Sequence, residues 1–157
     1  MTTAATLAGV ALAACALAAQ AQERRPEYGP DVNAVTAKKI AAATLAECQK
    51  NGWNVAVAIV DTHGFLVYFE RMENTQTAGI DIAPAKARVG AMYRRTTRVF
   101  AEAVAKGGPA IMTLPGVVAS PGGLPIFADG KVTGGVGVSG GTGDQDEQCA
   151  KAGLAGM

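Results

Sequence analysis

One histidine stands out among the residues that could do chemistry. His63 is the only histidine in the 157-residue chain. It lies between Thr62 and Gly64, with an apolar run on either side, and this pattern predicts a hairpin turn with the imidazole at its tip. A neutral imidazole exposed in this way can bind a metal ion or the iron of a macrocycle. The alternative is that His63 is a plain turn residue.

Three common kinds of site find no support. A hydrolytic triad requires a histidine base beside its nucleophile, and nothing in the sequence places Ser120 or Ser139 beside His63. One histidine and a few distant cysteines are too few ligands for a zinc site. The run 135–140 matches Gly-x-Gly-x-x-Gly. Because these glycines lie within an expected strand, rather than between a strand and a helix, the match predicts no dinucleotide site.

Carboxylates offer a second kind of chemistry, because a pair of them can act as general acid and base. Glu70 and Glu73 are close in sequence and are candidates for such a pair or are ordinary surface charges. Asp144, Asp146 and Glu147 begin the last predicted helix. We interpret these three as a solvated first turn that complements the helix dipole.

Several further side chains could help to hold a metallo-macrocycle such as haem. Methionine and tyrosine offer additional iron ligands, and basic side chains can pair with propionates. The candidates are Met72, Met92, Met112, Tyr68, Tyr93, Arg71, Lys86, Arg88, Arg94, Arg95 and Arg98. Each also has an ordinary interpretation, since methionine on a helix usually fills a core and arginine usually lies on the solvated face.

Two predicted hairpins would position these residues. The first joins strands at 54–61 and 65–71, and the second joins 124–128 to 131–139 through an Asp-Gly turn. We expect both hairpins to belong to one small sheet. The last strand is rich in glycine, which indicates that another backbone or a ligand approaches it closely. Its glycines are Gly134, Gly135 and Gly137.

Helical periodicity predicts the layers that cover this sheet. The expected helices run from an N-cap at Asp31 to Asn51, from near Ala83 to Met92, from Arg98 to Lys106, and onward from Thr142, with Gln145 as its capping-box partner. A short strand is expected within 110–120. Hairpin-linked strands with helices on the sheet's faces define an α+β domain.

The first residues have the composition of a secretory leader. Residues 1–21 are mostly Ala, Leu, Val and Thr and end in Ala-Gln-Ala, which predicts a signal peptide and a periplasmic or secreted protein. The alternatives are a lipid anchor at Cys15 and a misassigned start codon. The apolar core of the leader is too short for a membrane span. Residues 22–30 are then a linker, and 31–157 form one domain.

The charge balance bears on possible partners. Lys and Arg total 14 and Asp and Glu total 13. This balance does not favour nucleic acid or an anionic membrane surface as a partner. A net charge near zero instead favours association into a homo-oligomer.

Two cysteines remain after the predicted leader, Cys48 and Cys149. In an exported protein such a pair suggests a disulfide, here between the first and last predicted helices. The alternative is two buried free thiols, because cysteine is among the most buried residue types.

Three segments resemble one protein family. They are VAVAIVDTHGFLVYFERMENT, GIDIAPAKAR and GGLPIFADGKVTGGVGVSGGTGDQDEQCAKAGL. The third is the most specific, with GG-x-PI, an Asp-Gly turn and a GVSGGT strand end before a helix. Together they resemble the GlcG/HbpS-like haem-binding family, whose domain also occurs as the C-terminal part of PduO-type proteins, and the match extends over roughly 31–154.

The resemblance implies a profilin-like three-layer α/β/α domain with a five-stranded antiparallel sheet. It also implies assembly into oligomers and, in several members, binding of haem or a related tetrapyrrole. By position it points to His63 as the metal ligand, and to Arg71, Met72, Lys86 and Arg88 as cofactor-binding residues. The alternative for the last four is a role in the fold or the oligomer.

Three functional hypotheses follow. The first is an exported haem-binding or haem-sensing accessory protein that acts by reversible coordination. The second is an enzyme acting on a small organic acid or aromatic catabolite in a pocket between subunits, with a perturbed carboxylate such as Glu70 or Glu73. The third is a structural oligomer without a ligand, in which the glycine-rich strand allows close contact between subunits.

Overall fold

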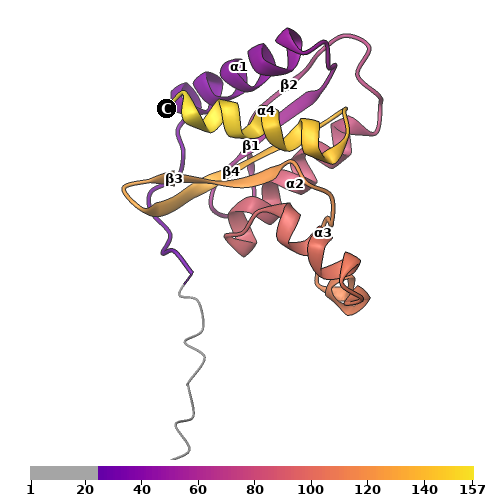
Figure 1. The fold of residues 1–157 in the computed structure, drawn as a ribbon. Coiled ribbons are helices and arrows are strands. Elements are labelled where there is room, and N and C mark those ends of the chain that lie inside the picture. The colour runs from indigo at the N-terminus through magenta and orange to yellow at the C-terminus, as the bar shows by residue number, and fades with distance from the viewer. Residues whose placement is uncertain (1–24) are drawn as a thin grey trace, which may run out of the picture.

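The computed structural model describes residues 25–157, so the predicted leader and Cys15 lie outside the described residues. The elements are α1 (Ala34–Lys50), β1 (Ala56–Val60), β2 (Leu66–Arg71), α2 (Gly79–Tyr93), α3 (Thr97–Ala105), the short 3-10 helix η1 (Pro109–Thr113), β3 (Gly123–Ala128), β4 (Lys131–Ser139) and α4 (Gly143–Ala155). Figure 1 shows their arrangement.

Both hairpins belong to one antiparallel sheet, as the sequence predicted. Its strand order is β2-β1-β4-β3. The two central strands, β1 and β4, pair from Ala56 opposite Ser139 to Val60 opposite Gly135. The described chain has four strands rather than the five that the family resemblance implied. The short strand expected within 110–120 is absent there, and a 3-10 helix begins at Pro109 instead.

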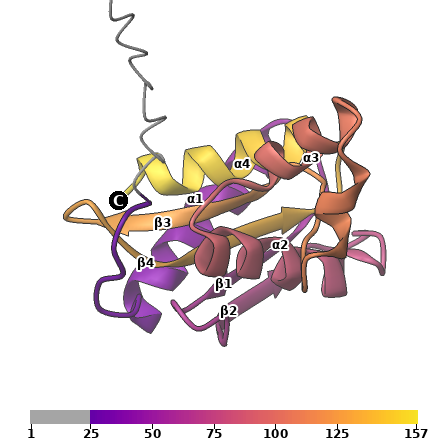
Figure 2. The ribbon, with the colours of Figure 1, turned by 90° about the horizontal axis from the view of Figure 1, so that it is seen from below.

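Helices cover both faces of this sheet (Figures 1 and 2). Successive strand side chains point to opposite faces, so β1 contributes to two clusters. Val57 and Ile59 pack with α1 and α4, whereas Ala58 and Val60 pack with the alanines of α2. The three-layer α+β architecture is therefore confirmed. None of the helices within 25–157 is long and apolar enough to cross a membrane.

The glycine-rich strand β4 allows α2 to lie unusually close to the sheet. A Cβ on Gly137 would overlap the carbonyl oxygen of Ala83, and one on Gly135 would overlap that of Ala87. The close approach indicated by these glycines is therefore a contact within one chain. It leaves no space for a ligand between α2 and these two positions.

We expect Gly137→Ala to destabilise the domain by about 1–3 kcal/mol, because α2 must move away from the sheet to admit the methyl group. Urea unfolding measures this change. Gly156→Ala is the matched control, since its added Cβ would meet nothing closer than 3.5 Å. Equal stability of the two variants would contradict the proposed packing role of Gly137.

Two helix starts differ from the predictions. The N-cap of α1 is Asn33 and not Asp31, and the Asn33 side chain accepts from the Thr36 N–H at 2.9 Å. Helix α2 begins at Gly79, before the expected start near Ala83, because the N–H of Gly79 bonds to the carbonyl of Gln76 and opens a turn upstream of the proline.

At the other end of the fold, the capping box predicted for the last helix is confirmed. The Thr142 hydroxyl accepts from the backbone N–H of Gln145, and the Gln145 side chain accepts from the backbone N–H of Thr142. Two orphan N–H groups of α4 are thereby satisfied. The chain therefore begins this helix at the residue that local sequence indicates.

A disulfide joins Cys48 of α1 to Cys149 of α4, with the two Cα atoms 5.5 Å apart. Both residues are fully buried in the cluster beneath these helices. Of the two alternatives left open by the sequence, the structure has the bridge. It fixes the two helices of one layer to each other over a sequence separation of 101 residues.

Candidate functional site

His63 stands at the tip of the β1–β2 hairpin on a turn fixed by one carboxylate. Asp61 Oδ1 accepts from the backbone N–H groups of His63 and Phe65, each at 2.9 Å. Gly64 adopts a φ of +86°, which favours glycine. The imidazole itself points outward, and its side chain is 72% exposed. The turn is thus held by hydrogen bonds to Asp61 while the ring remains accessible.

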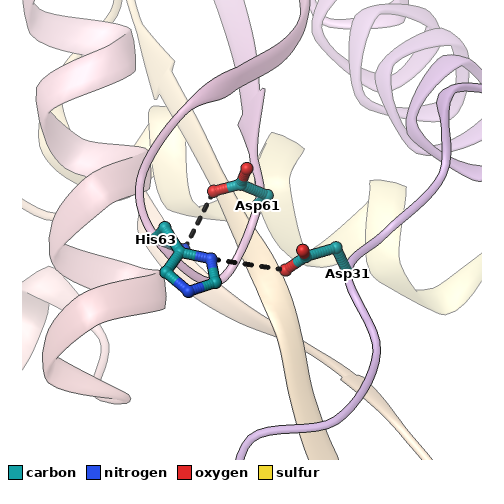
Figure 3. A group of neighbouring side chains, drawn as sticks. All are labelled: Asp31, Asp61 and His63. Carbon is teal, nitrogen blue, oxygen red and sulfur yellow. Dashed lines mark hydrogen bonds and ion pairs between the residues drawn. The ribbon is translucent and has the colours of Figure 1, made fainter.

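A second carboxylate reaches this turn from the segment before α1 (Figure 3). Asp31 Oδ1 accepts from the Thr62 N–H at 3.0 Å and from the Thr62 hydroxyl at 2.5 Å. The pKa of Asp31 is lowered below its ordinary value. The main cause is the hydrogen bond from the Thr62 hydroxyl, and the next is the hydrogen bond from the Thr62 N–H. His63 Nδ1 lies 3.2 Å from Thr62 Oγ1 and 4.0 Å from Asp31 Oδ1. The Asp31 carboxylate therefore places a negative charge near Nδ1 of the His63 ring.

A pocket of about 530 Å³ opens beside the imidazole. It is lined by Tyr28, Gly29, Pro30, Asp31, Thr62, His63 and Met92. Its volume lies within the range of roughly 300–1,000 Å³ that is typical of small-molecule sites. An aromatic ring, a proline and a thioether thus form an apolar wall beside one imidazole.

The segment before α1 forms one wall of this pocket. The Tyr28 hydroxyl donates to the carbonyl of Met92 at 3.0 Å, and the guanidinium of Arg94 lies over the Tyr28 ring at 4.9 Å from its centroid. Arg94 also donates to the carbonyl of Pro26 at 2.9 Å. Part of the stretch expected to be a linker is therefore packed against the end of α2.

Arg88 shares this corner of the molecule with His63. Its Nε donates to the carbonyl of Gly64 at 3.1 Å, although the side chain is exposed. Met92 lies one helical turn further along α2, and a Cβ on Gly64 would lie 2.9 Å from its Sδ. Of the five predicted cofactor-binding residues, the structure brings together His63 and Arg88.

Lys86 is placed elsewhere, in the interior. Its side chain is 2% exposed, and Nζ donates to Asp146 Oδ2 at 2.8 Å and to the carbonyl of Val138 at 3.0 Å. The prediction that the first turn of α4 is solvated is wrong for Asp146 and Glu147, because both are buried. Glu147 instead pairs with Arg98. These ion pairs tie α2 and α3 to α4.

Arg71 and Met72 lie at the far end of the first hairpin. Arg71 pairs with Ala56 at the start of β1, whereas His63 follows the end of β1. A strand rises about 3.3 Å per residue, which separates the two ends of this hairpin by roughly 15–20 Å. Met72 is half-buried and packs against the core beneath α1. Neither residue lines the pocket beside His63.

The ligand atoms of Asp31, Asp61 and His63 all lie within 4.8 Å of one another, as a metal site would require. One oxygen of each carboxylate already accepts two hydrogen bonds from the turn. The hydrogen bonds therefore give the cluster a structural explanation, in which the aspartates hold the histidine.

The other sequence candidates are not assembled into a site. Ser139 lies in a Gly-x-Ser-x-Gly run at 137–141, but it is 2% exposed and pairs with Ala56, at the end of β1 remote from His63. No triad can form across that distance. Glu70 and Glu73 are both exposed, and neither lines the pocket beside His63.

Comparisons of sequence and of structure with known proteins find relatives of the same family. A family model for haem degrading protein HbpS-like matches residues 32–155. Protein GlcG of Escherichia coli K12 is 42% identical over 103 residues, which are 66% of this chain and 77% of that protein. The crystal structure of HbpS superposes with a TM-score of 0.75 at 31% identity, covering 81% of this chain and 90% of the other. A PduOC–haem complex superposes with a TM-score of 0.74 at 27% identity, covering 81% and 95%.

The described fold is thus that of a three-layer α+β domain whose similar structures include a haem complex. The chain belongs to the HbpS-like family, as its sequence motifs suggested.

Proposed function

We propose that this chain is an exported haem-binding protein that holds the iron through His63. The observation that carries the proposal is the outward-facing imidazole on a fixed turn beside an apolar pocket. A similar structure, the PduOC–haem complex, also supports the proposal that the ligand is haem. The proposed mode of action is reversible coordination, as suits an accessory or sensing protein.

The donor chemistry of the site fits haem. Iron in haem takes an imidazole nitrogen as an axial ligand, and no residue within 25–157 engages Nε2 of His63. The apolar wall beside it includes Tyr28 and Met92, which suits the face of a macrocycle. Arg88 would pair with a propionate, because its exposed guanidinium lies at the same turn.

The open side of the site supports a proposed homo-oligomer. Phe65 is 71% exposed and Leu66 52% exposed, and both directly follow the histidine turn. Apolar side chains of this size at a cofactor site suit either the macrocycle or a neighbouring subunit that encloses it.

The proposed export rests on the disulfide as well as on the leader composition. Disulfides persist in oxidising compartments and are rare in the cytosol. The buried Cys48–Cys149 bridge is therefore consistent with a periplasmic or secreted protein. Fractionation of cells that express the full chain, followed by mass measurement of the mature protein, tests this part. Accumulation of the full-length chain in the cytosol would contradict it.

Haem titration followed by the Soret band tests the proposed ligand. We expect the wild-type protein to give a shifted Soret band at micromolar haem, and His63→Ala to bind at least about tenfold more weakly, because loss of groups that merely support a ligand already costs 10–100-fold. Arg71→Ala is the control, since it lies at the far end of the hairpin. Absence of a Soret shift in the wild type would overturn haem binding.

The same samples distinguish binding from turnover. The family description names haem degradation, so the bound spectrum is also followed over time in air with an added reductant. A stable Soret band supports reversible coordination. Loss of the band with release of iron would replace that proposal with haem breakdown. Glu70 and Glu73, the carboxylates proposed for an organic-acid enzyme, do not line the pocket beside His63.

A further inference from the structure

We propose that Thr62 and Asp31 are positioning residues that hold His63 as the Nδ1–H tautomer, so that Nε2 presents its lone pair to solvent. The effect of this tautomer on haem affinity rests on the function proposed above. The tautomer itself is a property of the protein alone.

The argument follows the protons. An ionised carboxylate can only accept hydrogen bonds, so the single hydroxyl proton of Thr62 must be donated to Asp31 Oδ1, 2.5 Å away. Thr62 Oγ1 is then left only with lone pairs on the side of the imidazole. His63 Nδ1 lies 3.2 Å from that oxygen, so Nδ1 must carry the proton that completes the contact. A neutral ring protonated on Nδ1 has its lone pair on Nε2.

The position of Asp31 makes this arrangement durable. Asp31 precedes Thr62 by 31 residues, and its neighbour Val32 donates to the carbonyl of Thr133 in β4 at 2.7 Å. On the other side, Tyr28 is bonded to the end of α2. The carboxylate is thus fixed by tertiary contacts on either side of it.

The arrangement also strengthens the histidine as a ligand. Histidines that bind metals usually donate their other ring N–H to a carboxylate, a carbonyl or water, and this contact fixes the tautomer and the orientation of the ring. Here the hydroxyl of Thr62 relays that contact to Asp31. Removal of such outer partners typically weakens metal binding by about 10–100-fold.

Nitrogen-15 NMR of the haem-free protein tests the tautomer directly. The chain has one histidine, so the two ring nitrogen signals are unambiguous. At about pH 8, where an ordinary imidazole is neutral, and after treatment with EDTA, we expect the wild type to show a protonated Nδ1 and an unprotonated Nε2. Thr62→Val should shift the population toward Nε2–H. Thr62→Ser should restore the wild-type signals, because the hydroxyl is kept.

Two further variants sharpen the test. Asp31→Asn should also shift the tautomer, because an amide can donate to Thr62 Oγ1 and release the hydroxyl proton toward His63. Thr77→Val is the control, since Thr77 is exposed and lies away from the turn in sequence. Unchanged ring signals in Thr62→Val and Asp31→Asn, or an Nε2–H wild type, would overturn the inference whatever the protein does with haem.

Haem titration of the same variants separates this inference from the proposed function. Thr62→Val should weaken haem binding by about 10–100-fold, with recovery in Thr62→Ser. If the tautomer shifts but the affinity for haem does not, the positioning role toward haem is wrong. If the wild type has the expected tautomer but binds no haem, the proposed function fails while the tautomer assignment holds.

Discussion

Lys86→Ala should cost about 3–5 kcal/mol of the free energy of unfolding, since it leaves the Asp146 carboxylate buried without its counter-charge. Both side chains are only 2% exposed, and their charged atoms are 2.8 Å apart. The carbonyl of Val138 would lose a donor as well. Chemical denaturation of the purified variant measures the loss.

Two comparisons make this result specific to the buried pair. Lys39→Ala is a matched control, because Lys39 is exposed on α1 and should change stability by less than about 0.5 kcal/mol. The double variant Lys86→Met with Asp146→Asn removes both charges and should recover part of the loss, because the remaining pair is neutral. If Lys86→Ala were as stable as Lys39→Ala, the ion pair would not be important for the fold.

The second large effect is expected from the disulfide. Replacing both Cys48 and Cys149 by alanine should lower the free energy of unfolding by about 2–5 kcal/mol, because the unfolded chain gains the freedom of a loop of 101 residues. Thermal or urea unfolding, followed by circular dichroism, measures the change.

Wild-type protein unfolded with a reductant present is the matched control for that variant. It keeps every sulfur atom and lacks only the covalent bond. A similar loss in the reduced wild type and in the double variant would assign the effect to the bond. Stability that is indifferent to reductant would mean that packing around the two residues, rather than the cross-link, holds α1 to α4.

Local sequence was sufficient for much of this fold. The Asp-Gly turn, the turn at His63 and the Thr142 capping box each depend on a few adjacent residues, and each is present. The α+β class, with helices on the faces of an antiparallel sheet, followed from the hairpins and the helical periodicity, and the three-layer form came from the family resemblance. The fifth strand came from the resemblance alone, and the described residues do not contain it.

The errors concern residues whose partners are distant in sequence. Aspartate is a residue type that is favoured at helix N-caps, but the Asp31 carboxylate accepts hydrogen bonds from a hairpin turn 31 residues away. Asp146 looked like a surface acid for the same reason, since its partner Lys86 lies 60 residues earlier. One signal was available, because Lys86 shares the face of α2 that carries Ala83 and Gly90, both buried. A lysine among small apolar residues on a buried face requires an internal counter-charge.

The cross-link between the first and last helices also closes a covalent ring. All four strands lie between Cys48 and Cys149 along the chain, and so does the histidine turn. A single proteolytic cut anywhere inside that ring would leave both pieces attached through sulfur. Damage in an exposed loop, such as the one around Gly116, would therefore nick the domain without releasing a fragment until the bridge is reduced.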